Sequence, residues 1–500
     1  MPTAAPRYPS LLQFNTRVLL RETAAALGRP ATLDDLPDTF LDQAAAEGFD
    51  WLWPLGVWQT GPAGRDLART VDNWGRAAYR QQLPDLSDDD ICGSPFAVRS
   101  YDVHADFGGD AALARLRERL RRRGVRLLLD VVPNHTALDH PWTETHPEYY
   151  VHGTESALAA QPRNFRRVGG HILAHGRDPY FPGWTDTLQL NYRHAGLRAA
   201  MLGELGRVAD RCDGVRCDMA MLLLRDVFLQ TWDGYALPSD GSAPADGSFW
   251  IEAIRAVRAT WPAFVLMAEA YWDREWTLQQ QGFDYTYDKR LYDRLHAGQG
   301  EAARMHLWAD LDYQRKSARF LENHDEPRAA AAFPFEMHRA AAVVTYCTPG
   351  LRFFHEGQFD GRRVRVPMQV SRRPDEAPDP LIGRFYRRLL SALGRADLRD
   401  GKWSLQDCRP AWDGNATWRN FLVFAWHADS RRLLACVNYG PTQGQCYVTV
   451  ALPELRGRTH HLTDLLGDAV YDRDGDGLAG NGLYLDMPAW GCHLFDITPV

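Results

Sequence analysis

Residues 214–220 read G-V-R-C-D-M-A, an apolar segment of strand character that carries one arginine and one aspartate two positions apart. In a β-strand, residues i and i+2 point to the same face, so Arg216 and Asp218 are expected to emerge together. A guanidinium beside a carboxylate lowers the pKa of the carboxylate and keeps it ionised, which suits a nucleophile. A buried Arg–Asp pair is more often structural than catalytic. A catalytic interpretation of this segment therefore requires further evidence from the rest of the chain.

Three further segments share this design of an apolar strand that ends in polar, ionisable residues. They are V-R-L-L-L-D-V-V-P-N-H (125–135), A-F-V-L-M-A-E-A-Y-W (263–272) and R-F-L-E-N-H-D-E-P-R (319–328). Functional groups at the carboxyl ends of successive parallel strands are typical of a (β/α)8 TIM barrel, whose site is assembled at that face. The sequence therefore predicts an α/β fold of this architecture.

The four segments, in this order, resemble the four ordered sequence regions of the α-amylase family, glycoside hydrolase family 13. The resemblance runs from about Leu11 to the C-terminus. It implies a catalytic barrel formed by residues 1–135 and 195–400, with an irregular B domain at residues 136–194 inserted after the third strand. Residues 401–500 are expected to form a separate antiparallel β domain, since alternating segments such as F-L-V-F-A-W and Y-V-T-V-A-L occur there.

The resemblance also implies a role for each of three carboxylates. Asp218 would be the nucleophile that forms a covalent glycosyl-enzyme, Glu269 the general acid and then the general base, and Asp325 the group that grips the sugar hydroxyls. The residues themselves support the first two roles, because Arg216 would keep Asp218 charged while the apolar run before Glu269 would raise its pKa. For a retaining mechanism, the carboxyl groups of Asp218 and Glu269 are expected about 5–5.5 Å apart.

Further side chains are expected to bind the sugar. His135 and His324 match the two family histidines that hold it, and Arg216 stands beside the nucleophile. The segment C-G-S-P-F-A-V-R-S-Y-D-V (92–103) resembles the wall of the family's sugar pocket, with Phe96 where many members carry a stacked tyrosine, and with Tyr101. For Phe96, an aromatic platform and simple loop packing are equally open.

The sequence departs from the family at its usual calcium site. The calcium-binding aspartate is replaced by Gln189, and Asn134 alone remains of the obvious ligands, whereas a hard cation requires several oxygen atoms. Residues 472–477 read D-R-D-G-D-G and copy the start of a calcium loop, but without its final glutamate, so a polar hairpin turn is expected there. We expect no metal and no cofactor.

Composition limits the possible partners and compartment. The net charge of −7 over 500 residues argues against a nucleic-acid or an anionic membrane partner. The eight cysteines form no C-x-x-C pair, the amino terminus lacks the pattern of a secretory signal, and no apolar run approaches the ~20 residues that cross a bilayer. A cytoplasmic protein that acts on an oligosaccharide is the expectation.

Local patterns predict several boundaries around the barrel. They place the first strand at Leu11–Leu20 and a helix at Leu33–Glu47 that starts after Thr32. They also predict one long loop over residues 56–105 and a Gly/Ser/Asp/Pro loop over residues 233–248.

The sequence thus predicts a retaining glycoside hydrolase that cleaves α-glucosidic bonds of short soluble α-glucans. A transglycosylase of the same family is the near alternative, because four residues expected on the acceptor side disfavour water: Met221, Leu222, Tyr271 and Trp272. A non-catalytic sugar-binding protein on the same barrel is the alternative from another class.

Overall fold

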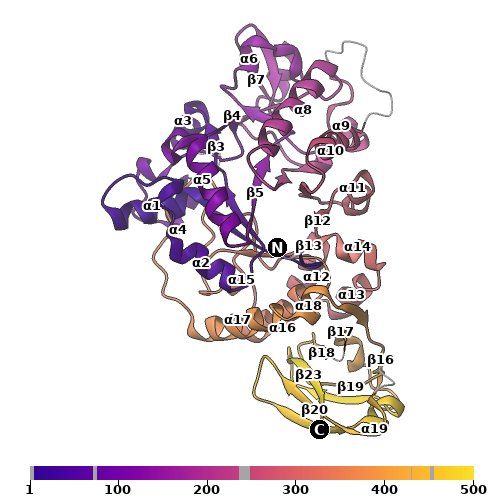
Figure 1. Ribbon diagram of the computed structural model, residues 1–500. Helices are drawn as coiled ribbons and strands as arrows, with labels where there is room; N and C mark the ends of the chain where they lie inside the picture. Colours follow the sequence, from indigo (N-terminus) through magenta and orange to yellow (C-terminus); the bar gives the residue numbers. More distant parts are fainter. Residues whose placement is uncertain (1–4, 71–75, 236–247, 430, 451–454) are drawn as a thin grey trace.

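Eight parallel strands close into a barrel in the computed structural model, which describes residues 5–70, 76–235, 248–429, 431–450 and 455–500 (Figure 1). Around the barrel their order is β1-β14-β13-β12-β11-β10-β5-β2. The strands are β1 (Ser10–Asn15), β2 (Trp51–Leu55), β5 (Arg126–Val131), β10 (Gly214–Cys217), β11 (Val265–Ala268), β12 (Tyr285–Tyr287), β13 (Ser317–Arg319) and β14 (Leu351–His355). The predicted (β/α)8 architecture is confirmed.

The strands are short and almost entirely buried, as expected for parallel strands that are covered on both sides. Their register brings the carboxyl ends level, since Arg216 lies opposite Asp130 on one side and Met267 on the other. Gly214 starts the central strand because a Cβ at this position would lie 2.7 Å from the carbonyl oxygen of Val265. Only glycine allows the two strands to approach this closely.

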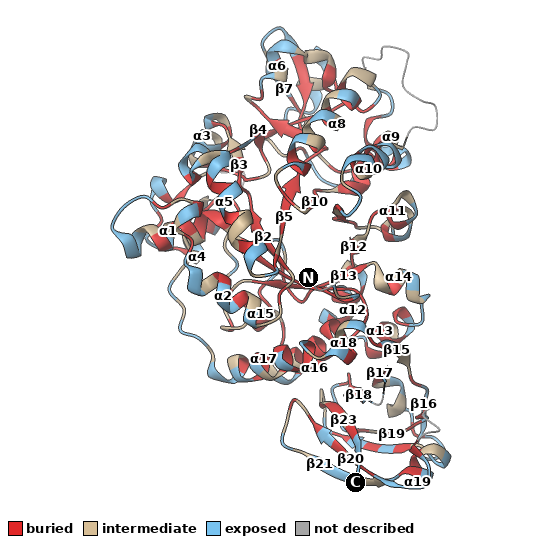
Figure 2. Cartoon of the chain, viewed as in Figure 1, coloured by how far each residue is buried: buried red, intermediate tan, exposed pale blue. Residues whose placement is uncertain are grey.

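Helices surround the strands and turn their apolar faces inward (Figure 2). In α17, for example, Ile382, Phe385 and Leu389 follow helical spacing and are buried. The helices of the barrel region are α1 (Thr16–Leu27), α2 (Asp38–Ala46), α5 (Gly109–Arg122), α8 (Ala195–Ala209), α9 (Arg225–Trp232), α10 (Phe249–Thr260), α11 (Glu275–Gln281), α12 (Lys289–His296), α13 (Gly300–His306), α14 (Leu311–Arg315), α15 (Ala329–Ala332), α16 (Phe335–Tyr346), α17 (Pro380–Leu393) and α18 (Ala396–Asp400). Within the described ranges, no helix is long and apolar enough to cross a bilayer.

Two predicted boundaries are wrong because local capping divides the segments. The first strand ends at Asn15, whose side chain accepts hydrogen bonds from the backbone N–H groups of Arg17 and Val18 and so starts α1. The helix expected at 33–47 is a short 3-10 turn, Leu33–Asp35, followed after Pro37 by α2. Thr32 does cap the turn, in a reciprocal capping box with Asp35.

The long loop expected at residues 56–105 is also wrong, because short elements occupy it. They are β3 (Trp58–Thr60), α3 (Pro62–Thr70), α4 (Arg76–Gln82) and β4 (Val98–Val103), with β3 and β4 antiparallel. Residues 236–247 of the loop expected at 233–248 lie outside the described residues.

The segment between β5 and α8 is built from short, mostly antiparallel pieces. These are β6 (His135–Ala137), α6 (Trp142–Thr145), α7 (Glu155–Ala160), β7 (Phe165–Val168), β8 (His171–Ala174) and β9 (Thr187–Gln189). Strand β6 pairs with β9, so that His135 lies opposite Gln189. This pairing closes the segment on itself and returns the chain to the barrel.

The C-terminal part of the chain forms the predicted antiparallel β domain. A six-stranded sheet in the order β15-β17-β18-β23-β20-β21 packs with a three-stranded sheet, β16-β19-β22. The elements are β15 (Lys402–Leu405), β16 (Cys408–Pro410), β17 (Phe421–Ala428), β18 (Arg431–Asn438), β19 (Gly444–Val448), β20 (Thr459–Asp464), β21 (Val470–Asp474), α19 (Gly475–Gly480), β22 (Leu483–Met487) and β23 (Cys492–Pro499). The hairpin turn expected at 472–477 is instead the junction of β21 and α19, where Asp474 caps the helix.

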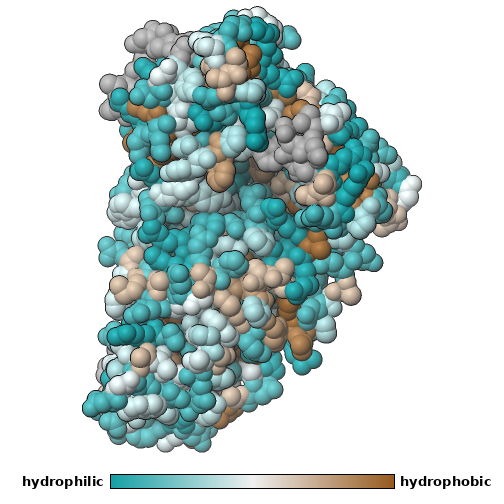
Figure 3. Space-filling view, turned by 180° about the vertical axis from the view of Figure 1, so that it is seen from behind, coloured by the Kyte–Doolittle hydropathy of each residue, from teal (hydrophilic) through white to brown (hydrophobic). Residues whose placement is uncertain are grey.

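One buried tryptophan joins this domain to the barrel. The indole nitrogen of Trp426 donates a hydrogen bond of 2.7 Å to the carbonyl oxygen of Cys347, at the end of α16. Its ring meets the ring of Tyr8 edge-on, with centroids 5.1 Å apart. The face of the molecule seen in Figure 3 is mainly hydrophilic, so apolar burial is concentrated inside and between these layers.

We predict that Trp426→Ala lowers the free energy of unfolding by about 3–5 kcal/mol, because it removes a fully buried ring and leaves the carbonyl of Cys347 unpaired. Urea unfolding followed by circular dichroism measures the loss. Trp412→Ala, in the same domain but 54% exposed, is the control and should change stability by less than about 0.5 kcal/mol. Equal losses in both variants would contradict the proposed anchoring.

Candidate active site

A cavity of about 430 Å³ opens at the carboxyl ends of the barrel strands. Chain segments from outside the barrel complete its wall, namely α4 and residues 365–369. Its lining includes Ser94, Phe96, His135, Trp184, Asp186, Asp218, Met219, Glu269, Tyr271, His324, Asp325 and Arg365. The structure thus brings together the three predicted catalytic carboxylates, both predicted histidines and Phe96.

Arg216, which the sequence predicted to bind the sugar, is fully buried and does not line the cavity, so that prediction is wrong; it is the centre of the group of carboxylates instead. Its Nη1 lies 2.6 Å from Asp218 Oδ1 and its Nη2 lies 2.7 Å from Glu269 Oε2, while Asp130 Oδ1 is 3.6 Å away. The ring of Phe96 lies 5.1 Å from the guanidinium carbon. One cation therefore faces three carboxylates inside an aromatic enclosure.

Burial dominates the ionisation of these carboxylates. It raises the pKa of Asp218, although the contact with Arg216 lowers it, so the expectation of a depressed pKa for Asp218 is wrong. It also raises the pKa of Glu269 against the opposing effect of Arg216, as the sequence predicted. Since one guanidinium cannot neutralise Asp130, Asp218 and Glu269 together, the cluster favours holding a proton.

Three left-handed backbone positions lie in the segments around Glu269. Met219, at φ 44°, donates its backbone N–H to Glu269 Oε2 at 2.6 Å. The hydroxyl of Tyr271 donates to Glu269 Oε1 at 2.7 Å. Trp272 and Asp273 follow at φ 59° and 62°, conformations that cost a bulky residue of order 1–3 kcal/mol and that cluster at functional sites.

Asp325 and His324 form the opposite side of the cavity. Gln13 Nε2 donates to His324 Nδ1 at 2.9 Å, which leaves the ring proton on Nε2, 3.1 Å from Asp325 Oδ2. Burial raises the pKa of Asp325, but the contact with His324 outweighs this effect and brings the pKa to about 2. The side chain of Asp325 is 44% exposed and faces the cavity as a carboxylate.

The other predicted binding residues separate into two groups. His135 lines the cavity and is neutral, because burial lowers its pKa to about 3. Phe96 lines it too, tilted by 34° against the ring of His324. Tyr101 does not line the cavity, so the prediction that it binds the sugar is wrong. The Tyr101 hydroxyl is buried, donates to the carbonyl oxygen of Val132 and accepts from the backbone N–H of Val132.

Several residues of the site escaped the sequence prediction. Trp184, Asp186 and Arg365 line the cavity, and Arg365 Nη1 donates to the carbonyl oxygen of Asp325 at 2.7 Å. They lie in irregular segments with no strand or helix period, although Asp186 begins the D-T-L-Q-L-N-Y run that resembles a fifth family region. Conversely, Met221 and Leu222, expected on the acceptor side, are buried in a 3-10 turn and do not line the cavity.

An amide pair occupies the place where the resemblance would put calcium. Gln189 Nε2 donates to both the side-chain and the backbone oxygens of Asn134, at 2.9 and 3.0 Å, and Asn134 Nδ2 donates back to Gln189 Oε1 at 3.2 Å. These bonds engage the side-chain oxygen atoms of both residues, which a hard cation would need as ligands. In the described part of the chain, no group of three or more His, Cys, Asp or Glu side chains is arranged to hold a metal. The residues present therefore do not fit calcium.

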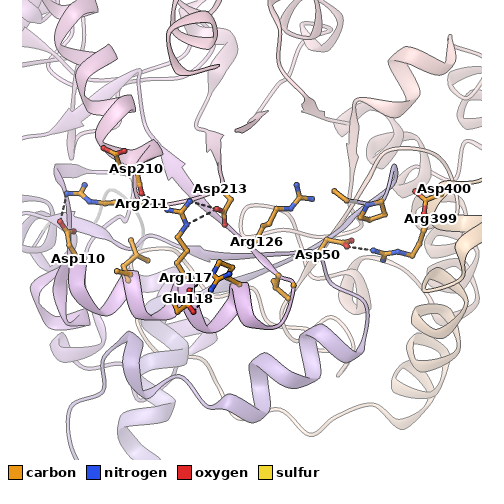
Figure 4. Close-up of a pocket in the computed structure, with 17 residues that line it drawn as sticks. Asp50, Asp110, Arg117, Glu118, Arg126, Asp210, Arg211, Asp213, Arg399 and Asp400 are labelled. Carbon is orange, nitrogen blue, oxygen red and sulfur yellow. Dashed lines mark hydrogen bonds and ion pairs between the residues drawn. The ribbon is translucent and has the colours of Figure 1, made fainter. Parts of the chain in front are cut away.

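A second, larger cavity of about 850 Å³ lies at the opposite, amino-terminal end of the strands (Figure 4). Arg117 pairs there with Asp213 at 2.6 Å, Arg211 with Asp110 at 2.7 Å, and Arg399 with Asp50. These pairs tie helices and loops to the starts of the strands. In a (β/α)8 barrel this face contributes stability rather than chemistry.

Two carboxylates that face one cavity at the catalytic face of a (β/α)8 barrel have the arrangement that glycoside chemistry uses. Over residues 97–362, more than half of its length, the chain matches the family model described as alpha amylase, catalytic domain. The chain belongs to the alpha-amylase family.

Individual relatives are distant. The chain is 26% identical over 273 residues to alpha-amylase MalA of Haloarcula japonica, covering 53% of this chain and 36% of that protein. It is 20% identical over 312 residues to alpha-amylase 3 of Dictyoglomus thermophilum, covering 57% of each. The chain thus spans from about a third to just over half of the length of these relatives. A solved maltogenic alpha-amylase, AmyB of Thermotoga neapolitana, superposes with a TM-score of 0.66 at 16% identity, covering 98% of this chain and 99% of that one, which shows a shared fold.

The amide pair leads to a prediction about metal. We expect an excess of chelator to shift the melting temperature by no more than about 1 °C, because the side chains of Asn134 and Gln189 bond to each other and leave no set of ligands for a cation. Differential scanning fluorimetry with and without chelator measures the shift. A fall of more than about 5 °C that added calcium reverses would contradict the assignment.

Asp186 leads to a prediction about pH. Burial raises its pKa to about 6, so the folded state binds a proton that the unfolded state has already released, and stability falls as pH rises from about 4 to 6. Asp186→Asn removes this cost and should stabilise the protein by about 2–3 kcal/mol at pH 7 but not at pH 4. Urea unfolding at both pH values measures it. Asp312→Asn, at an exposed site, is the control, and a gain independent of pH would contradict the assignment.

Proposed function

We propose that the chain is a retaining glycoside hydrolase that cleaves α-glucosidic bonds of short soluble α-glucans and oligosaccharides. The observation that carries the proposal is the bridge formed by Arg216, whose two terminal nitrogens hold Asp218 and Glu269. In retaining enzymes the two carboxyl groups are about 5–5.5 Å apart, a separation that one guanidinium can bridge.

In the first half-reaction Asp218 acts as the nucleophile. Its carboxylate forms a bond to the anomeric carbon, and the bond to the departing oxygen breaks as that oxygen takes a proton from Glu269. Glu269 Oε2 accepts a hydrogen bond from the Met219 N–H and lies in an ion pair 2.7 Å from Arg216, so Oε1, beside the Tyr271 hydroxyl, is the oxygen that carries the proton. The raised pKa of Glu269 suits this role.

In the second half-reaction Glu269, now a carboxylate, takes a proton from water. The resulting hydroxide adds to the anomeric carbon and the bond to Asp218 breaks, which regenerates both groups and retains the anomeric configuration. As Asp218 leaves, the negative charge returns to it beside Arg216.

The remaining cavity residues would bind the sugar. Asp325 offers an ionised carboxylate to sugar hydroxyls, His324 and the neutral His135 offer ring nitrogens, and Phe96 offers an apolar face. Helix α4 and residues 365–369 wall the cavity, and its volume of about 430 Å³ is in the range of sites for small ligands. These features favour a short substrate.

A transglycosylase of the same family is the second candidate. Tyr271 lines the cavity and Trp272 adjoins it, so an aromatic acceptor side would favour a sugar hydroxyl over water. Met221 and Leu222 are buried, so these two residues cannot form part of an apolar acceptor side. A sugar-binding protein without catalysis is disfavoured, since Asp218, Glu269 and Asp325 converge on one cavity.

We further infer a cytoplasmic location. All eight cysteines are unpaired and seven of them are buried, which suits a reducing compartment.

A product assay on maltose to maltoheptaose, sucrose and trehalose, with and without excess maltose, tests the proposal. Proton NMR follows the anomeric configuration of the products. Shorter products that are released with retained configuration would support the hydrolase. Longer products would support the transglycosylase, and unchanged sugars would contradict both.

We predict that Asp218→Asn lowers kcat by at least ~10³-fold, because an amide is a poor nucleophile and cannot form the glycosyl-enzyme. Initial rates on maltotriose measure the loss. Melting temperature and circular dichroism are the controls for folding, and Asp312→Asn is the matched substitution at an exposed site. Residual activity above about a tenth of the parent rate would remove Asp218 from the mechanism.

A further inference from the structure

An aromatic groove lies on the outer helices that follow β11 and β12. We define it by Trp276, Met305, Trp308 and Tyr313, which line a further surface cavity of about 660 Å³. The first three are 50–53% exposed, and the rings of Trp276 and Tyr313 lie 6.4 Å apart at 44°. Helices α11, α13 and α14 carry Trp276, Met305 and Tyr313 and lie along one side of the barrel in Figure 1, while Trp308 lies between α13 and α14. Clustered, exposed large apolar side chains mark a ligand surface.

One buried polar atom in the same cavity lacks a partner in the described chain. Arg294 Nη1 is buried and has no hydrogen-bond partner there. Glu275 is only 5% exposed, and its carboxylate accepts a hydrogen bond from its own backbone N–H and is attracted by Arg290. Leaving a buried polar atom unpaired costs stability, so the groove offers a hydrogen-bond donor to a ligand.

The charge of the groove excludes a strongly ionic ligand. Asp273, Glu275 and Asp310 stand against Arg290 and Arg294, and Arg290 is already paired with Asp273. Flat aromatic faces that alternate with hydrogen-bonding side chains suit a neutral polyhydroxylated chain, whose rings have apolar faces and polar edges.

One backbone turn links the groove to the catalytic cavity along the chain. Asp273, which lines the groove, follows Trp272 and lies two residues beyond Tyr271, which lines the catalytic cavity and contacts Glu269. Trp272 in turn meets the exposed ring of Tyr180 edge-on, with centroids 5.0 Å apart.

We propose that the aromatic groove binds a segment of neutral α-glucan chain outside the catalytic cavity. The choice of an α-glucan rests on the proposed function. The site retains longer chains, whereas substrates that fill only the catalytic cavity do not reach it.

Binding is tested by isothermal titration of maltoheptaose into Asp218→Asn protein, which does not consume the ligand. We expect two binding events, one of which is lost in the Trp276→Ala/Trp308→Ala double variant. Each single variant should weaken that event by about 5-fold, as the loss of one stacked ring does. Trp276→Phe, which keeps a ring, should restore most of the binding, and Trp412→Ala, at an exposed tryptophan elsewhere, should leave both events unchanged.

Turnover in the otherwise unchanged chain separates this proposal from the catalytic one. In the double variant we expect kcat/KM to stay within about 2-fold on maltotriose and to fall by about 5-fold or more on soluble amylose. If maltotriose is cleaved but the double variant keeps both binding events, the groove is not a glucan site and the proposed function stands. If the parent chain neither cleaves maltotriose nor binds maltoheptaose, the proposed function itself is wrong.

Discussion

Everything at the carboxyl face of the barrel depends on one buried guanidinium. A cation in an apolar interior is tolerated only when anions and hydrogen bonds replace its water, and Arg216 obtains them from three different strands. The parallel register of β5, β10 and β11 places Asp130 level with Arg216, while Asp218 and Glu269 follow the ends of their strands. Removing Arg216 would leave three buried carboxylates without a cation, so architecture and chemistry constrain each other here.

The barrel and the central residues of the site were predictable because both follow from short-range pattern. Apolar strands that end in ionisable residues mark the catalytic face, and Asp218, Glu269, Asp325, His135 and His324 all reach the cavity. The pKa direction of Asp218 was not predictable, since burial is a property of the whole fold and outweighs the neighbouring Arg216. Asp186 and Arg365 come from irregular segments, whose paths are set by tertiary packing rather than by periodicity. Tyr101 was predicted to bind the sugar because it is an aromatic residue in the segment that resembles the pocket wall. Its side chain instead points into the core, and the sequence pattern does not show this.

Hydrogen bonds join the two ends of the inserted segment. The side chains of Asn134 and Gln189 bond to each other, and β6 and β9 pair directly. Such a junction is assembled as the chain folds and does not vary with the concentration of an ion. Because the two amide groups are buried, an unpaired donor or acceptor among them would destabilise the fold. The two side chains therefore donate hydrogen bonds to each other in both directions.

The turn from Tyr271 to Arg274 belongs to two surfaces at once. Tyr271 holds the proton-bearing oxygen of Glu269, while Asp273 is bound to Arg290 beside the aromatic groove. Any coupling that this turn transmits between the two surfaces is reciprocal. By whatever factor a chain in the groove changes the affinity of the catalytic cavity, a sugar in the cavity changes the affinity of the groove by the same factor. The enzyme would then sense the length of its substrate through a single turn of backbone.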